Sequence, residues 1–257
     1  MLRARGGEVS SPWGQGPYTI FAPTDEAFNR LPGGIQQSLQ EDPELLRRTL
    51  LYHISPGVRE ARALRNEIRV DTLVSDKQLT VRIYADKKPT VNSAVLTVPD
   101  ARGSNGIVHI VSDVIYPIPE GDLWKTLESC NAFSSFAKLV REAELEDILS
   151  NTEKEEKWTI FVPVNAAFLL DESDKNDTNS LRELVRSHMV LGSHYSASLR
   201  DGLILYSVSA AATELEVGVR NGKLREVNIG RVLKADIPAT NGVIHAIDRI
   251  LLLPSIC

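Results

Sequence analysis

Short apolar runs that end at turn residues dominate the hydrophobic pattern of the chain. Residues 17–24 form one such run, closed by Pro23, which is typical of a short buried strand. Residues 42–53 differ: Asp42, Pro43 and Glu44 open a segment with leucines four positions apart, which predicts a helix that ends before a Pro-Gly pair. The other predicted strands of this half are residues 71–74, 78–84, 90–98 and 106–114.

The second half of the chain repeats this pattern. The apolar run at residues 157–163 ends at Pro163 as the earlier run ends at Pro23, and an Ala-Phe pair follows both runs. Strands are predicted at residues 214–219, 224–229 and 232–234, followed by a last strand that reaches residue 253. A segment with two prolines and a glycine at residues 117–121 lies between the halves and predicts a linker. The sequence therefore predicts a tandem repeat of one domain, at residues 1–117 and 122–257.

The most similar pair of segments is residues 99–111 and 235–248. Each contains an aspartate, a short predicted loop, an Asn-Gly pair and an apolar strand with one histidine. Asn-Gly supplies positive φ in tight turns at low cost, so a hairpin turn is predicted at both places. The candidate turn and core residues of these segments are Asn105, Gly106, His109, Asn241, Gly242 and His245. His188 is a further candidate core residue, because it corresponds in the second repeat to His53 of the first.

A helical pattern at residues 123–149 has no counterpart before Tyr18, where only 17 residues stand. We therefore expect the first domain to be truncated at its N-terminus and to lack its first helix. We expect the chain to be a fragment without its signal peptide, because residues 1–7 lack an apolar core. The missing helix would leave apolar sheet surface exposed.

Composition narrows the function classes. The net charge of −5 gives no basic footprint, which argues against a nucleic-acid partner. No apolar run approaches the roughly 20 residues of a membrane span. Two cysteines are too few for a disulfide framework; Cys130 and Cys257 could tie the start of the second repeat to its end or stay as two thiols.

The sequence carries no pattern that is specific to an enzyme. The five histidines form no regular metal-ligand spacing, and phosphate-loop, nucleotide-binding and nucleophile-elbow motifs are absent from the chain. We expect no catalytic activity, no cofactor and no metal site. Asn176 opens an N-glycosylation sequon in a polar segment, which would fit a secreted protein.

Three motifs, in the same order in both halves, resemble the fasciclin-like (FAS1) domain. They are residues 19–28 with 159–168, the histidines at 53 and 188, and residues 104–109 with 240–245. The resemblance implies an α+β fold, with a β-sandwich or wedge of about seven strands and packed helices in each domain. It also implies an extracellular protein, secreted or in the matrix, that adheres to integrins, to collagen-type and other matrix proteins, or to other FAS1 domains.

The resemblance further implies two integrin-binding motifs. One is the Asp-Ile pair before the Asn-Gly turn, matched by Asp236 and Ile237, whereas the first repeat has Asp100 followed by alanine. The other is the Tyr-His pair, matched by Tyr52 and His53, whereas the second repeat has serine before its histidine. Each repeat thus keeps one motif intact.

A structural interpretation stands beside each of these motifs. Asp236 could cap the turn while Ile237 packs in the core, and a histidine on the apolar row of a helix is most often a core residue with both nitrogens bonded. Two functions compete with adhesion: a segment of a scavenger or endocytic receptor, and a spacer that assembles through its own repeats. Tethered weak sites gain avidity, which favours adhesion through weak multivalent contacts.

Overall fold

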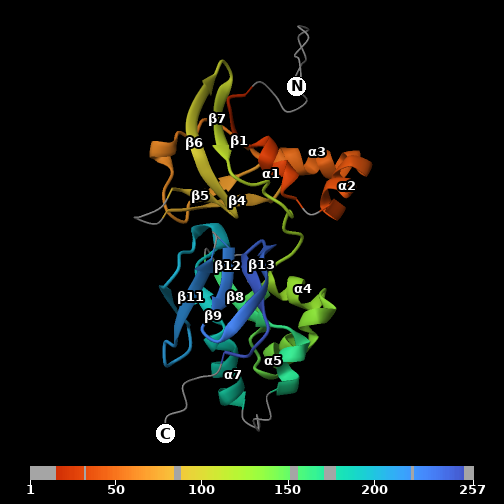
Figure 1. The fold of residues 1–257 in the computed structure, drawn as a ribbon, viewed down its shortest axis with the longest axis vertical. Helices are drawn as coiled ribbons and strands as arrows, with labels where there is room; N and C mark the ends of the chain where they lie inside the picture. Colours follow the sequence, from red (N-terminus) through yellow and green to blue (C-terminus); the bar gives the residue numbers. More distant parts are fainter. Residues whose placement is uncertain are drawn as a thin grey trace.

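The computed structural model describes residues 16–31, 33–83, 88–150, 156–170, 178–220 and 223–251. Two domains lie one above the other along the longest axis of the molecule, joined by a short connection after β7 (Figure 1). Each domain contains one seven-stranded sheet with helices packed on it. The α+β prediction for both halves is therefore confirmed.

The first domain begins with a strand and three helices. Its elements are β1 (Tyr18–Pro23), α1 (Asp25–Asn29), α2 (Gly33–Glu41), α3 (Pro43–Tyr52), β2 (Ile54–Pro56), η1 (Ala61–Ala63), β3 (Arg69–Asp71), β4 (Gln78–Arg82), β5 (Thr90–Val91), β6 (Ala94–Gly103) and β7 (Gly106–Val111).

The second domain begins with helices. Its elements are α4 (Leu123–Glu128), η2 (Asn131–Phe133), α5 (Ser134–Glu142), α6 (Glu146–Ser150), β8 (Trp158–Pro163), η3 (Asn165–Leu170), α7 (Thr178–Ser187), β9 (Met189–Leu191), η4 (Ser196–Ser198), β10 (Leu203–Tyr206), β11 (Glu214–Arg220), β12 (Lys223–Val227), β13 (Gly230–Ala239) and β14 (Gly242–Ile247).

The two sheets have the same topology. The strand order is β2-β1-β7-β6-β5-β4-β3 in the first domain and β9-β8-β14-β13-β12-β11-β10 in the second. Each sheet contains one parallel pair, β1 with β7 and β8 with β14, and its other pairs are antiparallel. The second sheet curls until a bridge between Val190 and Ser207 joins its two edges. The shared order and pairing show that the repeat seen in the sequence is a repeat of structure.

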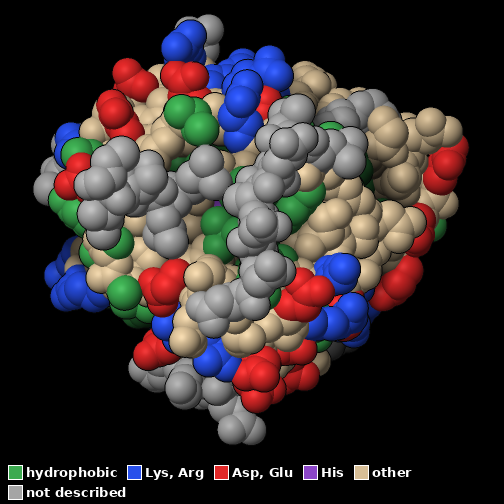
Figure 2. Space-filling view, turned by 90° about the horizontal axis from the view of Figure 1, so that it is seen from below, with side chains coloured by type: hydrophobic (Ala, Val, Ile, Leu, Met, Phe, Trp, Pro, Cys, Tyr) green, Lys and Arg blue, Asp and Glu red, His purple; other side chains and the backbone are tan. Residues whose placement is uncertain are grey.

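An apolar core fills the concave side of each curled sheet. In the first domain it gathers around Phe21 and Tyr52, and in the second around Phe161 and Leu215. The second domain has a further core between its sheet and helices α4, α5, α6 and α7. Seen from below in Figure 2, hydrophobic side chains on the described surface are interspersed with Lys, Arg, Asp and Glu side chains.

The helix-covered side of the sheet differs between the domains. Residues 16 and 17 are the only described residues before β1, so nothing described in the first domain corresponds to α4, α5 and α6. Ile20 is 36% exposed, whereas Ile160 at the same place in β8 is 0% exposed; Leu50 is 46% exposed, whereas Val185 of α7 is 0% exposed. The described first domain therefore presents apolar residues at positions where the second domain buries them.

One predicted helix is confirmed, and two predicted segments are interrupted. The helix at residues 42–53 is confirmed as α3, because Asp42 accepts hydrogen bonds from the backbone N–H groups of Glu44 and Leu45, both at 3.0 Å. Residues 90–98 were predicted as one strand but form β5 and part of β6, since Asn92 turns the chain with φ of 49°. The helical region at 123–149 is broken at Glu144, which also has positive φ.

The sequence predicts that a strand ends before Asp100 and before Asp236 and that a short loop follows each aspartate; that prediction is wrong. Both lie inside long strands, β6 and β13, where the pairing register shifts around them. Asn176 and Cys257 lie outside the described residues, so the glycosylation and disulfide predictions are not addressed. Cys130 is half-buried against the core beneath α4 and α5.

Candidate partner-binding site

Asp236 sits at a β-bulge in β13. The pairing of β13 with β14 shifts between Lys234 and Ile237, and Asp236 has φ of 61°. Aspartate tolerates the left-handed region better than most residues, because its short side chain bonds locally. A bulge turns one side chain and one N–H group out of the regular ladder, which here frees both groups of Asp236 for other partners.

The carboxylate of Asp236 caps the short helix η4. Oδ1 accepts a hydrogen bond from the backbone N–H of Ser196 at 2.7 Å, and Oδ2 accepts one from the Ser196 hydroxyl. The N–H groups at a helix start lack partners within the helix, so an acid there satisfies one of them. Asp236 therefore caps η4, 40 residues away, and not the Asn-Gly turn that the structural interpretation proposed.

His245 holds the backbone of Asp236 from inside the domain. Its Nδ1 accepts a hydrogen bond from the Asp236 N–H at 3.2 Å, and its Nε2 donates to the carbonyl of His194 at 2.9 Å. The ring is 0% exposed and stacks on Phe161 at 5.4 Å between centroids. Burial lowers the pKa of His245, although the Asp236 carboxylate opposes that effect. The ring is therefore a neutral Nε2–H tautomer with both nitrogens bonded.

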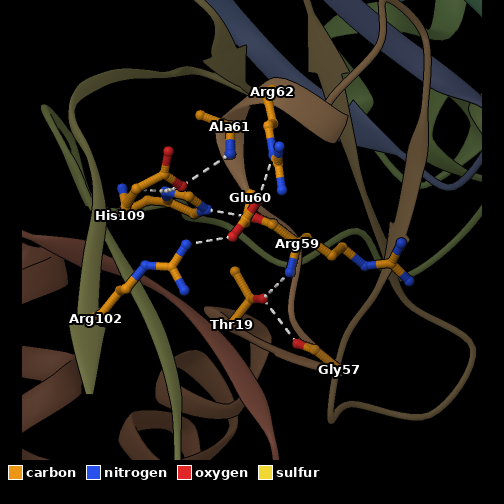
Figure 3. Close-up of polar contacts among 9 residues, drawn as sticks. Thr19, Gly57, Arg59, Glu60, Ala61, Arg62, Arg102 and His109 are labelled. Carbon is orange, nitrogen blue, oxygen red and sulfur yellow. Dashed lines mark hydrogen bonds and ion pairs between the residues drawn. The ribbon is translucent and has the colours of Figure 1, made fainter.

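The first domain repeats this arrangement, as Figure 3 shows around His109. Nδ1 of His109 accepts from the backbone N–H of Asp100 at 3.2 Å, and Nε2 donates to the carbonyl of Arg59 at 2.8 Å. The Asp100 carboxylate accepts from the N–H of Ala61 at 2.9 Å, the first residue of η1. Asp100 also has positive φ, at 60°. The aspartate, the histidine and the capped short helix are thus one structural device that occurs twice.

An ion-pair cluster flanks the device in the first domain. Glu60 pairs with both Arg62 and Arg102, as the dashed lines in Figure 3 indicate. The hydrogen bond from Arg62 is the largest of the effects that lower the pKa of the Glu60 carboxyl. Tyr195 stands at the corresponding position before η4, is buried, and has a raised pKa because of that burial. The two copies therefore present different surfaces around the same backbone.

Ile237 is half-buried. It packs against the core beneath the helices of the second domain and pairs with Ile244 of β14. Ala101, its counterpart on β6, is exposed. The structural interpretation of Ile237 fits this position. Within the Asp-Ile pair, the side chain of Asp236 is half-exposed and that of Ile237 packs against the core.

Tyr52 and His53 lie in the core of the first domain, 0% and 4% exposed. The Tyr52 hydroxyl donates to the carbonyl of Gln78 at 3.1 Å and accepts from the Asn92 amide at 3.2 Å. His53 donates from Nδ1 to the carbonyl of Thr49 at 2.8 Å and accepts at Nε2 from the N–H of Ile115 at 3.0 Å. Burial raises the pKa of Tyr52 and lowers that of His53.

His188 makes the same pair of bonds in the second domain. It donates to Leu184 at 2.8 Å and accepts from Leu251 at 2.9 Å. The histidines at 53 and 188 connect the end of a helix to the segment that follows the last strand of the sheet. No side-chain surface of the Tyr-His pair reaches solvent in a way that a partner could contact.

The Asn-Gly pairs serve a different purpose from the predicted one. Neither Asn105 nor Asn241 has positive φ; the turns are residues 104–105 and 240–241, and the glycines open the next strands. A Cβ on Gly106 or Gly242 would lie 2.1 Å from the carbonyl oxygen of Tyr18 or Trp158, respectively. Glycine is required because a parallel neighbour passes too close for any side chain.

Asn241 has a further role that Asn105 lacks. Its side chain accepts from the N–H of Leu123 at 2.8 Å and donates to the carbonyl of Leu149 at 2.7 Å. It is 1% exposed, whereas Asn105 is exposed. Asn241 therefore ties the hairpin to both ends of the helical segment that precedes β8.

The contact between the domains was not found from the sequence. Arg82 of β4 reaches the second domain, where its Nη2 lies 2.9 Å from Nδ1 of His194; it also pairs with Glu67. Burial is the main cause that lowers the pKa of His194 to about 3, and the Arg82 charge adds to it. Gly192 leaves the space for this guanidinium, because a Cβ there would lie 2.9 Å from Arg82 Nη1. No sequence signal marks a contact between residues so far apart.

Among the described residues, no group of three or more His, Cys, Asp or Glu side chains could hold a metal ion. None of the described helices is long and apolar enough to cross a membrane.

Comparison with known families assigns both domains to one family. The model of the fasciclin domain matches residues 8–117 and again residues 131–254. The chain belongs to the fasciclin domain family. Its two fasciclin domains are the two seven-stranded units described above.

Known relatives of the two fasciclin domains are larger proteins. The chain is 28% identical over 246 residues to transforming growth factor-beta-induced protein ig-h3 of Sus scrofa, covering 93% of this chain and 35% of that protein. It is 31% identical over 193 residues to stabilin-1 of Mus musculus, covering 72% of this chain and 7% of that protein. The chain thus spans about a third or less of these relatives.

A solved FAS1 domain pair from the insect cell adhesion molecule fasciclin I is similar over 92% of this chain and 88% of its own. The TM-score is 0.46 and the sequence identity 22%.

Proposed function

We propose that this pair of fasciclin domains is an extracellular adhesion or matrix-binding module that engages integrins through the Asp236 carboxylate. The observation that supports the proposal is the position and bonding of that carboxylate. It is half-buried, fixed by Ser196 and by the bulge, and lines a groove that opens to solvent. A carboxylate has about four acceptor sites, so the two bonds from Ser196 leave sites for a cation.

Integrin engagement would place a divalent cation of the partner against Asp236, because such cations prefer carboxylate oxygen. Asp100 holds the equivalent position but is followed by an alanine and flanked by the Glu60–arginine cluster. We therefore assign adhesion to the second domain. Tyr52 and His53 act in this account only by holding the fold of the first domain.

Membership of the fasciclin domain family and the similarity to transforming growth factor-beta-induced protein ig-h3 support an adhesive or matrix role without identifying a partner. The proposal includes secretion, a non-enzymatic role and weak contacts that gain strength from repetition, with collagen-type matrix proteins or other fasciclin domains as further partners.

Cell attachment tests the proposal. Wells coated with the chain should hold integrin-bearing cells in the presence of Mg²⁺ or Mn²⁺ and release them when EDTA removes the cation. Attachment that persists in EDTA would contradict integrin engagement through a carboxylate. Attachment to uncoated, albumin-blocked wells gives the background.

Two other functions predict different results. A structural spacer would self-associate in sedimentation experiments and hold no cells. A receptor segment is favoured by the similarity to stabilin-1, and it would bind soluble ligands that cells take up, with no dependence of cell attachment on Asp236.

A further inference from the structure

A groove runs along the junction between the two domains. Its volume is about 1020 Å³, at the upper end of the range for ligand sites in proteins. The first domain contributes residues between α1 and α2, before β5 and after β7, and the second contributes η4 and the facing parts of β12 and β13. Neither domain alone forms this groove.

Positive charge gathers on the walls of the groove. Four basic side chains line it, Arg30, Lys88, Lys223 and Lys234, against two acids, Asp113 and Asp236. The protein as a whole carries a net charge of −5, whereas basic side chains outnumber acidic ones in the lining of this groove. The groove therefore favours an anionic ligand over a cationic one.

Both acids of the groove have partners within the protein. Asp113 pairs with Arg30 at 3.2 Å and accepts a hydrogen bond from the Ser112 hydroxyl. Asp236 accepts two hydrogen bonds from Ser196.

The three lysines, by contrast, are exposed. None of them forms an ion pair with an acid of the described ranges; Lys88 makes one long hydrogen bond, 3.5 Å, to the carbonyl of Thr97. They come from both domains, so a ligand that met all three would bridge the junction.

Apolar side chains form the floor between these charges. Leu31 lies between α1 and α2, Ile35 belongs to α2, Val95 belongs to β6, and Leu199 follows η4. The first three are half-buried, so each still presents apolar surface. A ligand that carries only charge would leave this surface in contact with water, at a cost that rises with its area.

We propose that the interdomain groove binds an extended acidic peptide segment of a partner protein, whose apolar side chains cover the floor and whose carboxylates meet Lys88, Lys223 and Lys234. An extended peptide alternates its side chains, so acids and apolar residues can face opposite sides of the groove. This inference goes beyond the proposed function, because its ligand and its lysines differ from the integrin contact at Asp236.

Fluorescence anisotropy tests this proposal with the whole chain. The probe is a fluorescein-labelled peptide of about 12 residues, roughly 40 Å when extended, in which Glu alternates with Leu and Val. We expect saturable binding that K223E/K234E weakens more than about tenfold, and that K88E weakens as well, because like charges then face the peptide. A peptide with Gln at every Glu, and one with Ser at every apolar position, should both bind more weakly.

Matched variants separate this site from general charge attraction. K125E/K138E changes the net charge by the same amount at two exposed lysines of α4 and α5, and should bind the probe as the unmodified chain does. Equal weakening by both double variants, or no saturable binding, would overturn the proposal. So would a heparin oligosaccharide that binds at the same lysines more tightly than the peptide. D236N removes one negative charge from the groove wall and leaves the lysines in place, so it should bind the probe at least as tightly as the unmodified chain while it loses cell attachment.

Discussion

The imidazole Nδ1 of His245 accepts a hydrogen bond from the backbone N–H of Asp236 at 3.2 Å. That bond fixes the bulge of β13 and, through it, the carboxylate that caps η4. His109 and Asp100 make the same bond at the same distance in the first domain. The position of the candidate adhesion residue therefore depends on a buried, neutral histidine.

Replacing His245 with phenylalanine should destabilise the second domain. The variant keeps the stacking volume but leaves the Asp236 N–H and the His194 carbonyl without their partner, which costs about 2–4 kcal/mol. Urea unfolding followed by the fluorescence of Trp124 and Trp158, in α4 and β8, measures the loss. His109→Phe should leave this transition in place, and an unchanged midpoint for His245→Phe would contradict the role assigned to the ring.

The second domain should lose stability as the pH falls below about 6.5. Burial lowers the folded-state pKa of His194 to about 3 and also lowers that of His245, so the unfolded state binds more protons between those values and 6.5. This stabilisation is complete above pH 6.5 and is lost as the pH falls below it. His194 accounts for up to about 2 kcal/mol of the loss by pH 5, and His245 contributes in the same direction. Urea midpoints at pH 7 and pH 5 measure the effect.

His194→Gln supplies the control for this pH dependence. Glutamine can accept from Arg82 and donate to the Leu191 carbonyl as the histidine does, but it does not titrate. The variant should show a smaller change between pH 7 and pH 5. A variant that keeps the full pH dependence would show that His194 is not one of its sources.

Adding a methyl group to Gly242 should strongly destabilise the second domain. The new Cβ would lie 2.1 Å from the carbonyl oxygen of Trp158, so Gly242→Ala must push β8 and β14 apart, at a cost of about 3 kcal/mol or more. Gly34→Ala is the matched control: no atom lies within 4 Å of its Cβ position in α2, and alanine should stabilise that helix by up to about 1 kcal/mol. Thermal unfolding followed by circular dichroism should show a lower Tm for Gly242→Ala and an unchanged or higher Tm for Gly34→Ala.

Asn241→Ala and Asn105→Ala should lower the free energy of unfolding by different amounts, although each residue precedes the glycine at the same place in its repeat. The first removes two buried bonds, to Leu123 and Leu149, and should cost about 3 kcal/mol. The second alters an exposed side chain and should stay within about 0.5 kcal/mol. Equal effects in urea unfolding would mean that Asn241 serves only the turn.

Local signals in the sequence were enough to predict the repeat, the two domains and several elements. Asp42, Pro43 and Glu44 predict the start of α3 because capping is decided by neighbours in the chain. The family motifs likewise identify the fold, since both copies of the Asn-Gly pair stand before a strand with a histidine.

The site itself could not be predicted in the same way. The bulges at Asp100 and Asp236 leave no mark in the alternation of side chains, and the caps they provide lie 39 and 40 residues away. The contact between Arg82 and His194 joins two domains, and the groove at the domain junction exists only once both domains are placed. Such features depend on tertiary packing, which a single sequence does not display.

Charge removal at Asp236 tests the account most directly. Asp236→Asn keeps an oxygen acceptor for the Ser196 N–H but removes the charge that a divalent cation needs, and Asp100→Asn makes the same change in the first domain. With both variants folded and coated at equal density, cell attachment in Mn²⁺ should fall to the EDTA background for Asp236→Asn and stay unchanged for Asp100→Asn. Attachment that is equal for the two variants would contradict the account.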